Sequence, residues 1–103
     1  MKTSELTGAA LDWAVHQARF EGACHDEPFP SYSTDWSQGG PIIEREGISV
    51  RYRVGVNMTA SINGQYTQTI GHRHKGNIGL LVAMRCYVAS KLGDEIEIPE
   101  ELK

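Results

Sequence analysis

Acidic residues are absent from the middle of this 103-residue chain. Between Gly47 and Gly93 the sequence contains no aspartate or glutamate, whereas six lysine or arginine residues lie there. Both flanking segments are acidic, and the formal net charge is −3. A basic stretch between acidic ends predicts either a local anion-binding surface or ion pairs in which the ends cover the middle. The net negative charge disfavours nucleic-acid binding, which usually needs a basic domain.

Long hydrophobic runs are also missing. No apolar segment approaches the roughly 18 residues of a membrane span, and the N-terminal residues lack the apolar stretch of a signal peptide. The length fits a single domain, residues 1–103, with one modest core. We therefore expect one cytoplasmic domain that does not contact membranes.

Cysteines are few, and neither belongs to a CxxC motif. In a reducing cytosol, Cys24 and Cys86 are expected to be free thiols packed as small apolar groups. His72 and His74, two residues apart, could hold a metal with these cysteines, but nothing in the sequence brings the pieces together. We expect neither a metal nor another cofactor.

Two helices are indicated by apolar periodicity. The first would lie between a Thr7 cap and a Gly22 stop, and the second between an Asn77 cap and a Gly93 stop. Apolar residues in both recur at the i, i+3, i+4, i+7 spacing of a helix with one buried stripe. The stripes are Leu11, Ala14, Val15 and Ala18, then Ile78, Leu81, Val82, Ala89 and Leu92. Arg85 falls within the second stripe, where it must reach solvent, pair with a carboxylate or contact a ligand.

Strands are indicated between these helices. Residues 48–56 alternate apolar with polar, which predicts a half-buried strand with Arg51 and Arg53 on its exposed face. That face would be solvated or form an oligomer interface. The alternation between Gly93 and Pro99 predicts a short edge strand.

Asn63-Gly64 predicts a β-hairpin. We favour a three-residue loop, because a two-residue loop would mismatch the two faces. That register places one set of apolar side chains on the same face: Met58, Ala60, Ile62, Tyr66 and Ile70. The fold class is α+β, with two helices packed on a small antiparallel sheet that contains this hairpin. So small a core makes self-association, as a homo-oligomer, an expected source of stability.

Residues 24–40 lack periodicity and are interpreted as an irregular connection. Tyr32 and Trp36 could stack a nucleobase or a sugar, with Asp35 accepting its hydrogen bonds. In the slightly favoured alternative, Trp36 anchors the segment to the core and Asp35 caps a turn. Residues 39–41, Gly-Gly-Pro, are expected to turn the chain with positive φ before a strand. On that strand Glu44 and Glu46 could do acid–base work, but are expected instead to form an exposed charged row, with Arg45 between them on the other face.

Three blocks of the sequence resemble the phage NinX-like family. They read "SELTGAALDWAV", "YSTDWSQGGPIIEREGI" and "AMRCYVASKLGDEIEIPEEL". Relatives tend to read "GPTPLIAAMRCYVAS" before the last helix, whereas this chain reads "GNIGLLVAMRCYVAS" and can cap with Asn77. Members of the NinX-like family are small proteins of lambdoid and other tailed phages and of prophages. The resemblance implies an accessory protein in the host bacterial cytoplasm, without implying a reaction or catalytic residues.

The most coherent candidate site from sequence is His72-Arg73-His74-Lys75, followed by Gly76 and Asn77 at a helix N-terminus. Basic side chains beside exposed backbone N–H groups suit phosphate or carboxylate.

These features favour a binding protein over an enzyme. It would capture a small anionic, nucleotide-derived ligand, or block a host defence protein, in the service of counter-defence. The candidate ligand-binding residues are Tyr32, Asp35, Trp36, Arg51, Arg53, His72, Arg73, His74, Asn77 and Arg85. The alternative is a small hydrolase acting on a phosphorylated or nucleotide substrate. The groups available to it are His72, His74, Asp35 and Glu44.

Overall fold

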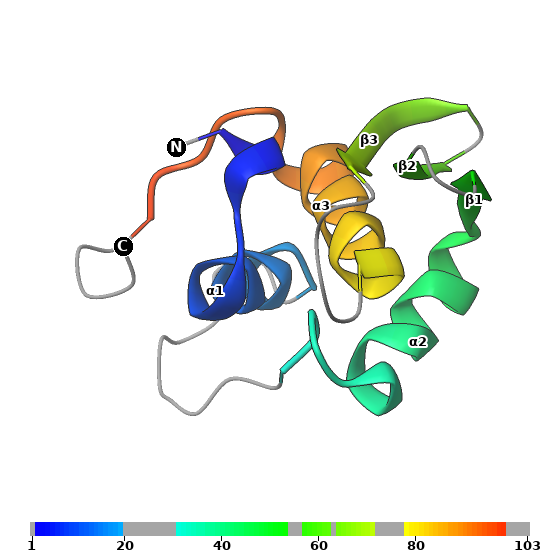
Figure 1. Cartoon of the computed structure of the whole chain (residues 1–103). Helices are drawn as coiled ribbons and strands as arrows, with labels where there is room; N and C mark the ends of the chain where they lie inside the picture. Colours follow the sequence, from blue (N-terminus) through cyan, green and yellow to red (C-terminus); the bar gives the residue numbers. More distant parts are fainter. Residues whose placement is uncertain (1, 20–30, 54–56, 63, 72–77, 99–103) are drawn as a thin grey trace.

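A computed structural model gives the fold of the chain and describes residues 2–19, 31–53, 57–62, 64–71 and 78–98 (Figure 1). It begins with the short 3-10 helix η1 (Thr3–Glu5). The helices are α1 (Gly8–Arg19), α2 (Trp36–Glu46) and α3 (Ile78–Leu92). The strands are β1 (Ile48–Arg53), β2 (Asn57–Ile62) and β3 (Gln65–Gly71). The α+β class is confirmed, with three helices in the described part instead of the two expected.

The three strands form an antiparallel sheet in the order β1-β2-β3. In β1 the predicted alternation holds only in part: Ile48 is buried and Ser49 and Arg51 are exposed, but Val50, expected on the buried face, is 38% exposed. β1 pairs with β2 in a regular register that brings Arg51 opposite Thr59. Helix α3 covers one face of this sheet. The polar side chains therefore occupy the other face.

The expected three-residue hairpin loop is wrong at the tip. Ile62 pairs with Gln65, so only two residues separate the strands. The register then shifts by one residue, which pairs Met58 with Ile70 and places them on one face as expected. Tyr66 lies in this β-bulge with φ of 55° and is 47% exposed, so it does not share the buried face. The bulge absorbs the mismatch that a two-residue loop creates.

Helix α3 is the centre of the fold. α1, α2 and all three strands pack against it, as Figure 1 shows. Residues 82–89 are buried without interruption, so the predicted single stripe is too narrow. Leu80 is fully buried, whereas Leu81 on the predicted stripe is only half-buried. Because α3 packs against neighbours on several sides, it needs apolar residues on more than one face.

Helix α2 replaces the predicted connection and strand start. The Asp35 carboxylate caps it by accepting hydrogen bonds from Ser37 N at 2.9 Å and Ser37 Oγ at 2.7 Å. Pro41 lies inside the helix, and Gly39 and Gly40 are helical instead of turning the chain. Residues 44–46 consequently lie on a helix, where Glu46 contacts Lys91 at 3.6 Å. Glycine and proline disfavour helices by propensity, and packing against α3 overrides that preference here.

The residues around η1 and those that directly follow α3 lie side by side. Thr3 N donates to Asp94 O at 2.7 Å, and Thr3 Oγ1 donates to Gly93 O at 2.7 Å. Lys2 and Glu95 form a single antiparallel bridge. The predicted edge strand after Gly93 is therefore wrong, because this segment pairs with the N-terminal residues and not with the sheet. Gly93 itself ends α3 as expected, with φ of 92°.

Helix α1 follows its predicted stripe. Leu11, Ala14 and Val15 are buried against the core, and Ala18 packs partly against it. Asn77, the predicted cap of the last helix, lies outside the described residues. None of the described helices is both long and apolar enough to cross a membrane.

Candidate functional site

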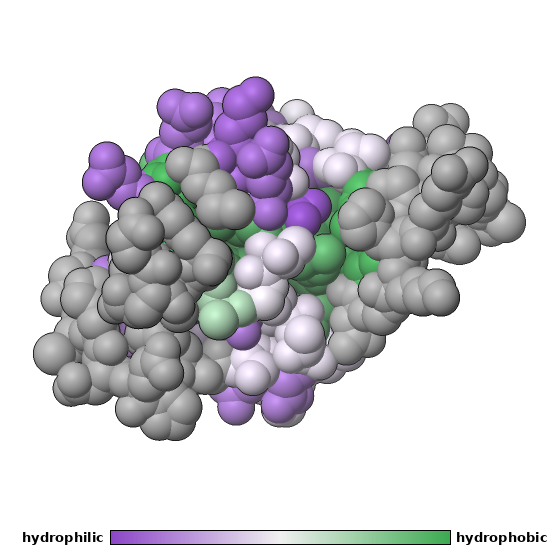
Figure 2. All heavy atoms as spheres, turned by 60° about the vertical axis from the view of Figure 1, so that its left-hand side comes forward, coloured by the Kyte–Doolittle hydropathy of each residue, from purple (hydrophilic) through white to green (hydrophobic). Residues whose placement is uncertain are grey.

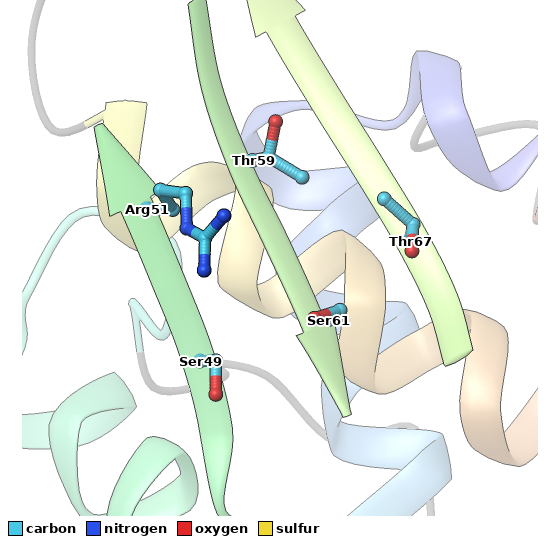
Figure 3. A pocket seen from close by; sticks show the side chains of 5 residues that line it. All are labelled: Ser49, Arg51, Thr59, Ser61 and Thr67. Carbon is cyan, nitrogen blue, oxygen red and sulfur yellow. The ribbon is translucent and has the colours of Figure 1, made fainter. Parts of the chain in front are cut away.

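The outer face of the sheet carries a shallow pocket with a space of about 410 Å³. Its lining is polar and comes from all three strands: Ser49, Arg51, Thr59, Ser61 and Thr67. Strand alternation gathers these side chains on one face, because their apolar neighbours turn towards α3. Figure 3 shows the Arg51 side chain over the gap between β1 and β2, with four hydroxyl side chains on the same face.

Arg51 dominates the charge of this surface. It is exposed, and it makes no ion pair with any carboxylate in the described ranges. Thr59 Oγ1 and Thr69 Oγ1 lie 3.3 Å apart and share a hydrogen bond across β2 and β3. A guanidinium fork binds carboxylate or phosphate in a bidentate manner. The surrounding hydroxyls can donate to the remaining anion oxygens.

Only part of the predicted site can be placed in this pocket. Arg51 lines it, and Arg53 follows on the same strand, although the structure does not describe the Arg53 side chain. The predicted residues of the basic segment lie outside the described residues: His72, Arg73, His74 and Asn77. Their contribution stays a prediction.

The two aromatic residues of the 30s segment differ in exposure. Tyr32 is fully buried, so its ring faces are closed to a ligand in this structure. Trp36 is 52% exposed, which shows that the prediction of a core anchor assigned the wrong aromatic residue. The anchor is Tyr32, whose hydroxyl lies 3.2 Å from His16 Nδ1 and 3.5 Å from Arg19 Nη1. Asp35 caps helix α2, where a turn was expected.

A polar row on α1 holds this segment in place. Asp12 Oδ1 accepts a hydrogen bond from Ser33 N at 2.9 Å. Burial raises the pKa of Asp12, and the interactions with Ser33 oppose that rise. His16 and Arg19 follow at i+4 and i+7 on the same helix and contact Tyr32. These contacts explain how an irregular segment reaches the start of α2 in a fixed position.

Arg85 is an internal structural residue of α3. It is only 6% exposed, and its Nε donates to the Leu6 carbonyl oxygen at 2.8 Å. Burial lowers the pKa of Arg85, and no carboxylate pairs with it among the residues that the structure describes. The sequence indicated that this arginine needs a partner. The partner is a backbone carbonyl, which none of the three expected solutions included.

The hydroxyl residues of the pocket were missed from the sequence. Their signal is the repetition of small polar residues at alternate positions: Ser49 and Arg51 on one strand, Thr59 and Ser61 on the next. Alternation of this kind marks the solvent face of a sheet. It becomes a candidate site only when the strand register sets the two rows side by side.

A family model described as "Bacteriophage P22, NinX" matches residues 16–91. The chain belongs to this family. The matched range includes α2, the whole sheet and nearly all of α3, so the Arg51 surface lies within the NinX region. This confirms the resemblance and makes the chain a phage protein. A search of curated proteins finds no match.

Neither the NinX assignment nor the described residues point to a metal. In the described part of the chain, no three side chains of His, Cys, Asp or Glu come together as metal ligands. Cys86 is buried and free, and burial raises its pKa to about 11. A thiol of this kind is a poor ligand and a poor nucleophile at neutral pH.

Proposed function

We propose that this NinX protein binds a small anionic, nucleotide-derived ligand on the outer face of its sheet and retains it without converting it. The observation that carries the proposal is Arg51 among four hydroxyl side chains, without an ion-pairing carboxylate in the described residues. In a phage protein, such capture would serve counter-defence in the host cytoplasm by withdrawing a nucleotide-derived immune signal.

Charge and size both support a phosphorylated ligand. The acid-free stretch from Gly47 to Gly93 includes the whole sheet, and the charged residue in the pocket lining is Arg51, so an anion meets positive charge there. The pocket space of about 410 Å³ lies within the roughly 300–1,000 Å³ of small-molecule sites. Arg53 and the residues 72–77 lie in the same stretch, and we expect them to add basic contacts around a phosphate.

Capture is favoured over hydrolysis by the chemistry of the lining. General acid–base catalysis needs a group that exchanges protons near the working pH. The pocket lining offers a guanidinium and hydroxyls, without a histidine, carboxylate or thiol among its described residues. Asp35 and Glu44, which the hydrolase alternative would use, lie at α2, not in the pocket lining.

The test is retention of ligands from a nucleotide panel that includes linear and cyclic mono- and dinucleotides. The full chain is incubated with the panel, freed of unbound material, heated and analysed by chromatography. Recovery of an intact nucleotide supports capture. Recovery of a converted product replaces capture with the hydrolase function. No retained nucleotide overturns the proposal and favours a host protein as the target.

A matched pair of arginine variants locates the site. Arg51→Gln removes the guanidinium from the pocket, and we expect roughly tenfold weaker binding or more, as for the loss of a hydrogen bond to a charged group. Arg45→Gln removes a half-exposed arginine on α2 that pairs with Glu46. This control should bind as the unmodified protein does. Equal binding by both variants would place the ligand elsewhere.

Self-association is the second part of the proposal. Among the side chains that the structure describes, three large apolar ones are exposed: Trp36, Val50 and Tyr66. A second copy that covers some of them would add to a small core. Light scattering on the full chain measures this directly, and a monomer at all concentrations would contradict it.

A further inference from the structure

A second pocket lies where residues 2–4 and 94–95 come close to strand β3. It has a space of about 380 Å³, and its lining mixes charges of both signs with neutral polar groups: Lys2, Ser4, Gln68, Asp94 and Glu95. Figure 2 shows hydrophilic residues gathered at the upper part of the molecule, at the height where Figure 1 draws η1 and the start of the segment that follows α3. This pocket is separate from the Arg51 surface and shares no lining residue with it.

Gln68 distinguishes this pocket from an ordinary charged surface. The residue is only 9% exposed, and its side chain makes no hydrogen bond to another residue that the structure describes. Strand alternation turns Gln68 to the opposite face from Thr67, where it lines the second pocket. Its amide is not a fully buried group without a partner, so its polar atoms meet solvent in the pocket. A polar ligand there can replace this solvent with direct hydrogen bonds.

The walls of the pocket are held in place by the backbone. Thr3 donates two hydrogen bonds, both of 2.7 Å, to the carbonyl oxygens of Gly93 and Asp94. The bridge between Lys2 and Glu95 extends this pairing by one residue. These contacts are made by Thr3 and by backbone groups. They leave four side chains available to the pocket: Lys2, Ser4, Asp94 and Glu95.

We infer that this pocket binds a small zwitterion of amino-acid size. The Asp94 and Glu95 carboxylates would hold an ammonium group. Lys2, the Ser4 hydroxyl and the Gln68 amide would donate to a carboxylate. A ligand with a single charge would meet a like charge on one wall, whereas a zwitterion matches both signs.

Three related probes test this charge pattern: norvaline, its amide, which lacks the carboxylate, and pentanoate, which lacks the ammonium group. They are added to the full ¹⁵N-labelled chain, and the side-chain amide signals of Gln68 are followed. These signals are assigned by their loss in Gln68→Leu. Norvaline should shift them with an affinity of roughly millimolar strength, in keeping with its few heavy atoms. Each single-charge probe should bind about tenfold more weakly.

Two outcomes would contradict the expected order of affinities, norvaline above the two single-charge probes, and would overturn the inference. If norvaline leaves the Gln68 amide signals unchanged, the amide is simply hydrated. If norvaline amide or pentanoate binds as tightly as norvaline, the pocket recognises one charge only. Neither outcome affects the nucleotide test, which is made at the other site with other probes.

Variants of the acidic wall provide the matched comparison. Asp94→Asn with Glu95→Gln removes both negative charges and leaves the backbone contacts between residues 2–3 and 94–95 intact. Glu97→Gln changes an exposed carboxylate on the same segment that does not line the pocket. Norvaline binding should weaken at least about tenfold in the double variant and stay unchanged in the control. Equal weakening in both would show an unspecific charge effect and refute the site.

Discussion

Replacing Gly39 by alanine tests how closely helix α2 packs against the core. A Cβ atom at Gly39 would lie 2.5 Å from Leu80 Cδ1 and at least as close to the carbonyl oxygen of Tyr32. The Leu80 side chain can rotate away, but the Tyr32 oxygen belongs to the backbone. At Gly40, on the same helix, the nearest atom would be Trp36 Cε3 at 3.8 Å, an ordinary contact. The two glycines therefore form a matched pair.

The expected effects have opposite signs. Alanine is favoured over glycine inside a helix by about 1 kcal/mol, and this gain applies to both positions. Overpacking a core contact costs about 1–3 kcal/mol, and a clash with backbone belongs at the upper end of that range. Gly39→Ala should therefore lower the free energy of unfolding by about 1–2 kcal/mol. Gly40→Ala should raise it by up to about 1 kcal/mol.

Urea denaturation followed by far-UV circular dichroism measures both variants. For a domain of this size, 1 kcal/mol corresponds to roughly 4–8 °C in Tm, so a thermal scan gives an independent reading. If both variants gain the same stability, α2 does not approach α3 at Gly39. The explanation of the glycine pair by close packing would then be refuted.

Three further predictions concern single side chains. Hydrogen bonds from Ser37 lower the pKa of Asp35, so its contribution to stability is present above its ordinary pKa of 3.8 and is lost as the pH falls through the lowered value. Asp35→Ala should lower the urea midpoint at pH 7 and flatten its fall in acid, and an unchanged acid profile would contradict the cap. Arg85→Met should destabilise the protein by about 1–3 kcal/mol, because the buried Leu6 carbonyl loses its donor, and a neutral effect on chemical denaturation would argue against that contact. In a Cys24→Ser background, Cys86 should resist an aromatic disulfide reagent at pH 8 and react fully in urea, because burial raises its pKa to about 11. Rapid labelling of the native protein would show that Cys86 is accessible.

The sequence predicts those elements whose pattern is local. The stripe of α1 and the alternation of β1 depend on spacing alone; the stripe is confirmed, and the alternation holds except at the exposed Val50. Helix α2 could not be predicted in this way. Gly39, Gly40 and Pro41 all favour a turn by propensity, and only packing against Leu80 gives them a reason to be helical.

Burial of side chains is also a property of the assembled fold. Tyr32 and Trp36 are equally good anchors by residue type, and the choice between them depends on where α1 presents His16 and Arg19. Arg85 was recognised as exceptional, but its Leu6 partner is 79 residues away in sequence. The candidate site likewise depends on the assembled fold. Arg51 could be named from its strand, whereas its hydroxyl neighbours required the register of three strands.

The most direct test of the proposed function is calorimetric titration of the nucleotide retained from the panel into the unmodified chain, Arg51→Gln and Arg45→Gln. Binding at the outer face of the sheet predicts that Arg51→Gln loses roughly tenfold or more in affinity, while Arg45→Gln keeps it. Both variants should unfold at the same urea concentration as the unmodified protein, because their side chains lie at the surface. Undiminished binding by Arg51→Gln would contradict the account.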